Sequence, residues 1–317
     1  MKRRDFIEKT AATTAFLGLG LAPMFAADSK IQAQSMLPQA ALNKTKHLTV
    51  LHTNDVHSYI DPFPPTHPKS PNMGGVARRA NLIESIRLEN PNVLLLDAGD
   101  IFQGTPYFNF YGGELEFKLM SMMGYDAATM GNHDFDNGLE GFYSQLPHAR
   151  FDFISSNYDF KNTILDGHVK PYRIFEKGGI KVGVFGLGIA LEGLVDKKHF
   201  RETVYLNPVG ITQDMVKTLK DEKKCDLVIC LSHLGYQYKD DQQRICDLKL
   251  ASLTSGIDLI IGGHTHTFLD KPTVVKNLIG QEVLVNQVGC YGINLGRIDF
   301  YLEPNMAGKT IGKTIVV

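Results

Sequence analysis

The chain has 317 residues, of which 43% are hydrophobic and 21% are charged, and its formal net charge is −1. This composition is ordinary for a globular protein, and the length suits one large domain or two small ones. The near-neutral balance argues against a nucleic-acid-binding protein, because such proteins usually carry a basic surplus or patch.

The first 27 residues have the pattern of an export signal. A basic start that includes Arg3 and Arg4 precedes an apolar run over residues 11–27, which contains small residues near its end. The run is shorter than the roughly 20 residues of a membrane span, so we expect no span after signal removal. The arginine pair resembles a twin-arginine signal, which predicts a periplasmic or otherwise exported protein. A general secretory signal and an uncleaved anchor are the alternatives.

Residues 28–46 are rich in Ala, Gln, Ser and Lys without periodicity, and we expect a linker there. From residue 47 onward, short apolar runs alternate with segments of helical character. Continuous Val, Ile and Leu runs are typical of strands buried on both faces, and the alternation predicts an α/β fold. No repeat or change of composition interrupts residues 47–317, which we expect to form one domain. The expected strands are residues 48–52, 93–96, 127–130, 153–155, 181–186, 227–231, 259–261, 282–287 and 296–301, and the expected helices include residues 76–89, 114–123 and 208–223.

One segment, residues 60–75, departs from this alternation. It is rich in proline and ends in two glycines, a composition that predicts a stiff irregular loop. Two roles are open for it: a surface connection, which we favour, or a rim over a site. Arg78 and Arg79 begin the next helix, where they either neutralise a substrate phosphate or occupy an exposed helix face, the interpretation we favour.

The cysteines, Cys225, Cys230, Cys246 and Cys290, match no spacing of a thiolate metal site. We expect four core thiols. A disulfide formed after export is the alternative, and the spacing selects no pair.

Five short polar blocks each follow an apolar run. Polar groups at the end of a buried strand cost free energy unless something satisfies them, and α/β sheets bind ligands beyond the carboxyl ends of their strands. Imidazole, carboxylate and amide oxygen suit divalent ions such as Mn, Fe, Co and Zn, while the lack of thiolates argues against structural zinc. Together the blocks predict a metal centre, with Asp100 suited to bridge two ions. They contain Asp55 and His57; Asp100; Asn132, His133, Asp134 and Asp136; His233; and His264 and His266.

The blocks Asp-x-His, Gly-Asp, Gly-Asn-His-Asp, Ser-His and Gly-His-Thr-His resemble the calcineurin-type metallophosphoesterase signature. More narrowly, HTNDVH at 52–57, GDIFQG at 99–104, GNHDFD at 131–136 and GGHTH at 262–266 resemble the catalytic domain of the 5'-nucleotidase/UDP-sugar hydrolase family. The resemblance covers about residues 48–301. It implies a four-layer α/β/β/α sandwich and two divalent metal ions, which are Mn, Zn, Fe or Co.

The resemblance also implies roles for nine residues. His133 faces the phosphoryl group and Asp136 orients it, as a catalytic pair. Family members often have Glu at the position of Asp134, which is not a ligand in the family. One ion is held by Asp55, His57, Asp100 and His266, and the other by Asp100, Asn132, His233 and His264.

The implied activity is hydrolysis of phosphate esters or phosphoanhydrides, above all of 5'-nucleotides or nucleotide sugars, by attack of a metal-bound hydroxide. Related two-domain enzymes carry a C-terminal domain that binds the nucleoside, and because the chain ends at Val317 we expect none here. Either a separate nucleotide-binding domain protein supplies it, or loops of the catalytic domain recognise the substrate. The candidate loops are residues 60–75, 102–111 and 236–243.

Two other classes stay open. One is a two-manganese sulfur-ester hydrolase of the same broad family. The other is a non-catalytic metal- or nucleotide-binding subunit, against which the presence of His133 and Asp136 argues, since a binding protein has no need of them. The expected partner is a small phosphorylated substrate, above all a nucleotide, and not a nucleic acid.

Overall fold

The computed structural model describes residues 45–303 and 309–317. The predicted export signal and the linker up to residue 44 lie outside these residues. Two six-stranded sheets and a short two-stranded ribbon, β5 (Tyr158–Asp159) with β8 (Val204–Tyr205), make up the described β-structure. None of the helices in the described part combines the length and the apolar character needed to cross a membrane.

The first sheet has the strand order β14-β13-β1-β2-β3-β4. Its last four strands run parallel, whereas β13 and β14 are antiparallel additions at the other side. The carboxyl ends of β1, β2 and β3 therefore meet at one edge. The strands are β1 (Lys46–Thr53), β2 (Val93–Asp97), β3 (Ala127–Ala128), β4 (Asp152–Phe153), β13 (Asn294–Leu302) and β14 (Lys309–Val316).

The second sheet has the order β11-β12-β10-β9-β7-β6. Its four central strands are parallel, and each outermost strand is antiparallel to its neighbour. The strands are β6 (Tyr172–Lys177), β7 (Ile180–Leu187), β9 (Leu227–Ser232), β10 (Leu259–Gly262), β11 (Thr273–Lys276) and β12 (Glu282–Asn286).

Alternating side chains of the central strands divide between separate cores. In β2, Leu94 and Leu96 face the second sheet and share a core with residues such as Ile229 of β9, whereas Leu95 points to the opposite face. This follows from the two-residue period of a strand. Because both faces are buried, the central strands appear in the sequence as continuous apolar runs.

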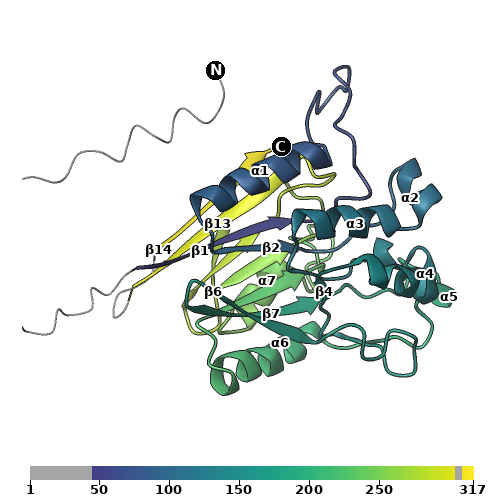
Figure 1. Ribbon diagram of the computed structural model, residues 1–317. Helices are drawn as coiled ribbons and strands as arrows, with labels where there is room; N and C mark the ends of the chain where they lie inside the picture. Colours follow the sequence, from purple (N-terminus) through teal and green to yellow (C-terminus); the bar gives the residue numbers. More distant parts are fainter. Residues whose placement is uncertain (1–44, 304–308) are drawn as a thin grey trace, which may run out of the picture. The chain divides into compact units, whose positions relative to one another are not determined.

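Helices cover the outer face of each sheet (Figure 1). Ile83 and Phe117, from two different helices, pack in the core on the outer face of the first sheet. Leu250, from another helix, packs in the core on the outer face of the second sheet. The result is the expected mixed α/β architecture of four layers. The helices over the first sheet are α1 (Val76–Glu89), α3 (Glu114–Met123) and α4 (Gly138–Gln145), and those over the second are α6 (Pro208–Val216) and α7 (Asp247–Leu253).

All nine predicted strands are present, although those expected at residues 127–130 and 153–155 are only two residues long. Residues 60–75 contain neither helix nor strand before α1, as predicted. The four cysteines are buried and free, which agrees with core thiols. The remaining elements are α2 (Pro106–Tyr111), α5 (Lys197–Phe200), the 3-10 turns η1 (His133–Phe135) and η2 (Leu146–His148), and a π-helical continuation of α6, η3 (Lys217–Glu222).

Candidate metal centre

The two sheets bring the predicted metal ligands together at the carboxyl ends of their parallel strands. The first sheet contributes from the loops after β1, β2 and β3, and the second from the loops after β9 and β10. The first set is Asp55, His57, Asp100 and Asn132, and the second is His233, His264 and His266.

One group of donors consists of Asp55, His57, Asp100 and His266, whose ligand atoms all lie within 4.8 Å of one another. Nε2 of His57 is 3.1 Å from Nε2 of His266 and 3.7 Å from Oδ2 of Asp100. Nε2 of His266 is in turn 3.4 Å from Oδ1 of Asp55. Two ring nitrogens and two carboxylates that converge in this way fit a divalent cation.

The second group shares Asp100 with the first. The ligand atoms of Asp100, His233 and His264 lie within 4.8 Å of one another, and Nε2 of His233 is 3.0 Å from Oδ2 of Asp100. Asn132 joins this group, because its Oδ1 is 2.9 Å from Nδ1 of His264. A carboxylate that belongs to both groups stands where a bridging ligand would stand.

Hydrogen bonds to backbone carbonyls fix the tautomers of two of the histidines. Nδ1 of His233 lies 2.7 Å from the carbonyl oxygen of Ala98, and Nδ1 of His57 lies 3.2 Å from that of Phe102. Because a carbonyl only accepts, Nδ1 carries the proton and the lone pair of Nε2 is directed into the cluster. For His233, Nε2 is buried and faces Oδ2 of Asp100 at 3.0 Å. The donor set therefore fits two divalent ions.

The charges of the cluster also suit cations. Burial lowers the pKa of His264 to about 4, which keeps its imidazole neutral, the form that binds metals. Burial opposes protonation of His233 too, but the carboxylates of Asp100 and Asp55 outweigh it and raise the pKa of His233 to about 10. A metal cation at this position would supply the positive charge that the proton on His233 supplies to Asp100 and Asp55.

The backbone adopts the left-handed region at five of the seven candidate ligands. For residues other than glycine this region is uncommon, and such strain gathers at functional sites because the surrounding structure must enforce it. The φ values are 50° at Asp55, 49° at His57, 55° at Asp100, 72° at His264 and 50° at His266. At these ligands the backbone therefore takes an uncommon conformation, and the surrounding structure enforces it so that the side chains converge.

Asp134, for which the sequence suggested no role, organises two of the ligand loops. Its carboxylate accepts backbone N–H bonds from Gly131, Asp100, Ile101 and Phe102 at 2.8 to 3.1 Å. Burial, together with the charge of Asp100, raises the pKa of Asp134 to about 7. The only hint in the sequence is an acid placed inside a block of ligand residues.

Replacing Asp134 with asparagine is expected to lower the free energy of unfolding by about 2–4 kcal/mol, since the amide accepts through one oxygen and leaves buried N–H groups unsatisfied. Urea unfolding of the two proteins at the same pH measures this difference. A chelator in the buffer excludes any contribution from bound metal. The matched control is Asp214→Asn on the exposed side of α6, and equal stability of the two variants would contradict the assigned role.

The predicted catalytic pair lies at the rim of the cluster. Nδ1 of His133 is 3.0 Å from Oδ2 of Asp136, and the two side chains are 38% and 31% exposed. The hydrogen bond to Asp136 raises the pKa of His133 above its ordinary value. The backbone N–H of His133 donates to Oδ1 of Asp100 at 2.8 Å, which fixes the pair relative to the shared carboxylate.

The expectation that Arg79 lies on an exposed helix face is wrong. Arg79 is only 3% exposed, because it shares the inward face of α1 with Ile83 and Ile86, whereas Arg78 is exposed as expected. The spacing i, i+4, i+7 was the signal that could have shown this. A buried guanidinium of this kind is not available to a substrate phosphate.

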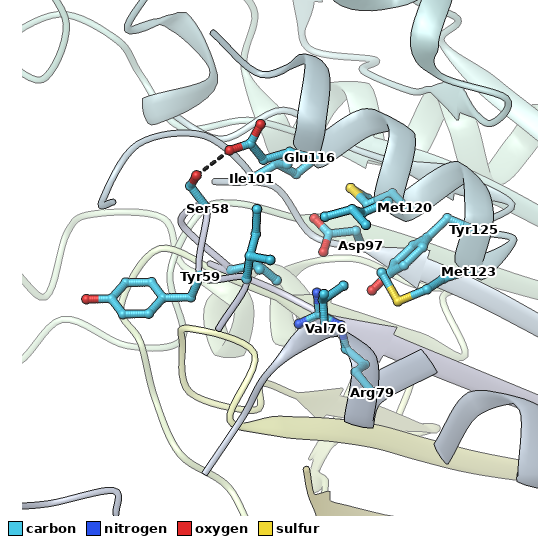
Figure 2. A pocket seen from close by; sticks show the side chains of 13 residues that line it. Ser58, Tyr59, Val76, Arg79, Asp97, Ile101, Glu116, Met120, Met123 and Tyr125 are labelled. Carbon is cyan, nitrogen blue, oxygen red and sulfur yellow. Dashed lines mark hydrogen bonds between the residues drawn. The ribbon is translucent and has the colours of Figure 1, made fainter. Parts of the chain in front are cut away.

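Arg79 points into a small cavity under the loop that follows Asp55 and His57 (Figure 2). Asp97 and Glu116 line the same cavity. Its volume of about 20 Å³ is enough for one water molecule. Nε and Nη1 of Arg79 and Oε2 of Glu116 have no partner among the described residues. A buried water therefore fits these groups.

Comparisons with known proteins show the family to which the chain belongs. Residues 48–268 match the family model described as calcineurin-like phosphoesterase. The chain is 35% identical over 295 residues to the trifunctional nucleotide phosphoesterase protein YfkN of Bacillus subtilis, an alignment that covers 83% of this chain and 18% of that protein. It is 33% identical to the 5'-nucleotidase of Rattus norvegicus, with 86% of this chain and 50% of that protein covered.

A solved structure, the 5'-nucleotidase precursor from Thermus thermophilus, superimposes with a TM-score of 0.76 at 34% identity. The match covers 85% of this chain and 54% of the other. The chain thus spans about half or less of the length of these relatives. Its fold, its ordered blocks and the family model agree, and the chain belongs to the calcineurin-like phosphoesterase family, with 5'-nucleotidases among its homologues.

Proposed function

We propose that the protein is an exported hydrolase of phosphate esters or phosphoanhydrides that uses two divalent metal ions, with 5'-nucleotides or nucleotide sugars as its substrates. The observation that carries this proposal is that Asp100 belongs to two donor groups while the His133–Asp136 pair lies at their rim. The proposed ligands are Asp55, His57, Asp100 and His266 for one ion and Asp100, Asn132, His233 and His264 for the other.

When bound, two such ions polarise the phosphoryl oxygens and lower the pKa of water enough for nucleophilic attack near neutral pH. Asp55 and Asp100 are the only carboxylates in the two donor groups, so they offset half of the charge of two dications. The remaining positive charge favours an anionic phosphate ester over a neutral ester.

His133 supplies the proton that the reaction needs. Asp136 holds its ring through Nδ1, so Nε2 is free to donate to a phosphoryl oxygen or to the leaving oxygen. The raised pKa of His133 supports a protonated donor. Export by the twin-arginine route belongs to the proposal as well, and its support is the Arg3–Arg4 pair ahead of the apolar run.

The test is phosphate release by the purified protein supplied with Mn²⁺ or Co²⁺, from a nucleoside monophosphate, a nucleotide sugar and p-nitrophenyl phosphate. A chelator is expected to abolish turnover, and returning either ion is expected to restore it. Metal analysis of the same sample gives the number of ions per chain. Two bound ions with no phosphate released from any substrate would contradict the proposal, and release from a sulfur ester alone would favour the alternative hydrolase.

A further inference from the structure

Arg244 separates two hollows on the side of the second donor group. One, of about 390 Å³, has mostly apolar walls that include Ile189, Leu234 and Ile245. The other, of about 410 Å³, is bounded by Tyr238 and by three cationic side chains against a single acidic one: Lys239, Arg244 and Lys249 against Asp241. Arg244 lines both, so an apolar surface and a positive surface meet at this side chain.

The guanidinium of Arg244 is placed for an anion. Its central carbon lies 4.1 Å from the ring centroid of Tyr238, so the ring occupies one face. Arginines 173, 201 and 297 pair with carboxylates, but no ion pair joins Arg244 to any residue within 45–303 or 309–317. A stacked guanidinium without a carboxylate keeps its N–H edge for a bidentate acceptor such as phosphate.

The wall that holds Arg244 is continuous with the candidate metal centre. The ring of Tyr238 lies 6.5 Å from that of His264, measured between centroids. Its hydroxyl donates to the backbone carbonyl of Leu234 at 2.8 Å. Leu234 directly follows His233 and also lines the apolar hollow. Tyr238 and Leu234 therefore connect Arg244 and the apolar hollow to the second donor group.

We propose that Arg244 and the apolar hollow form the subsite for the leaving part of the substrate: Arg244 binds a second anionic group, and the hollow accepts a ring system carried by the same leaving group. The inference rests on the proposed hydrolase function and narrows it to substrates in which a second phosphate follows the transferred one, such as nucleoside 5'-diphosphates. In that hydrolysis the oxygen of water bonds to the terminal phosphorus and the bridging P–O bond breaks. The electron pair stays on the leaving phosphate, and a proton is released.

The experiment compares kcat/KM for adenosine 5'-diphosphate and for p-nitrophenyl phosphate, which has no second charge. Arg244→Gln is expected to lower the value for the diphosphate by roughly 10- to 100-fold, the range for loss of a charge-assisted hydrogen bond. The value for p-nitrophenyl phosphate is expected to stay within about twofold. Arg244→Lys, which keeps the charge without the planar edge, is expected to recover only part of the loss.

Lys239→Gln is the matched control, because it removes the same charge from an exposed position that lines the same hollow. Equal losses for Lys239→Gln and Arg244→Gln would overturn the subsite in favour of general electrostatic attraction. Equal losses for both substrates would overturn it as well, since they would show damage to the centre itself.

Binding measured by calorimetry separates this inference from the function on which it rests. The probe is a methylene-bridged nucleoside diphosphate, which cannot be cleaved at the bridge, added to the full chain with Mn²⁺. Weaker binding by Arg244→Gln, but not by Lys239→Gln, supports the subsite even if the unmutated protein releases no phosphate. Unchanged binding by Arg244→Gln overturns the subsite while leaving the hydrolase proposal intact.

Discussion

Replacing Asp100 with asparagine is expected to lower phosphate release by at least about 100-fold and to reduce the metal content of the purified protein. Changes in the groups that merely orient metal ligands cost about 10- to 100-fold, and Asp100 belongs to both donor groups. Asparagine has nearly the same shape, so it removes the charge and the bridging capacity while the fold is preserved. Elemental analysis and turnover measured on one sample check both effects.

Asp166→Asn serves as the control, because Asp166 is exposed and belongs to neither donor group. It is expected to retain full metal content and turnover. An Asp100→Asn protein that kept two ions and normal turnover would show that the shared position of Asp100 has no functional meaning.

Replacing His133 with alanine is expected to lower kcat by about 10²–10⁴-fold, the usual contribution of a positioned acid or base. The metal content should not change, because His133 belongs to neither donor group. This combination distinguishes a group that moves a proton from a group that holds an ion. Steady-state kinetics with metal analysis on the same preparation measures it.

Replacing Asp136 with asparagine is expected to lower kcat by about 10-fold, also without a change in metal content. The loss is smaller because His133 stays in place and loses only the carboxylate that orients its ring. His148→Ala is the control, since His148 lies at the end of η2 outside the cluster, and its kcat should remain within about twofold. If His133→Ala lost metal together with activity, its role would be structural.

The central strands could be predicted because both of their faces are buried. β2 and β9, buried at every position, appear in the sequence as unbroken apolar runs. Among the strands that were missed, β6, β11 and β14 are outermost in their sheets, and their half-exposed residues mix polar with apolar types. Pairing with a neighbour creates such strands, and pairing is not encoded in local composition.

The candidate ligands could be predicted as residue types at strand ends, but not as distances. The Asp-x-His spacing does not predict the left-handed backbone conformation at Asp55 and His57. That conformation determines where their side chains meet. Asp134 was missed because its partners are backbone N–H groups, which every residue has and no motif displays. Arg79 was misplaced because a charged residue on a helix is usually exposed.

Each of the two donor groups draws on both sheets: His266 completes one and His233 the other, while Asp100 comes from the first sheet in both cases. An ion bound in either group is therefore a reversible cross-link between two layers that are also held together by the apolar side chains packed between them. Leu94 and Ile229 belong to the core between the two sheets. Their packing therefore helps to set the distance between the ligands that the first sheet contributes and those that the second contributes. Metal affinity in this fold is in part a property of the packing between its sheets.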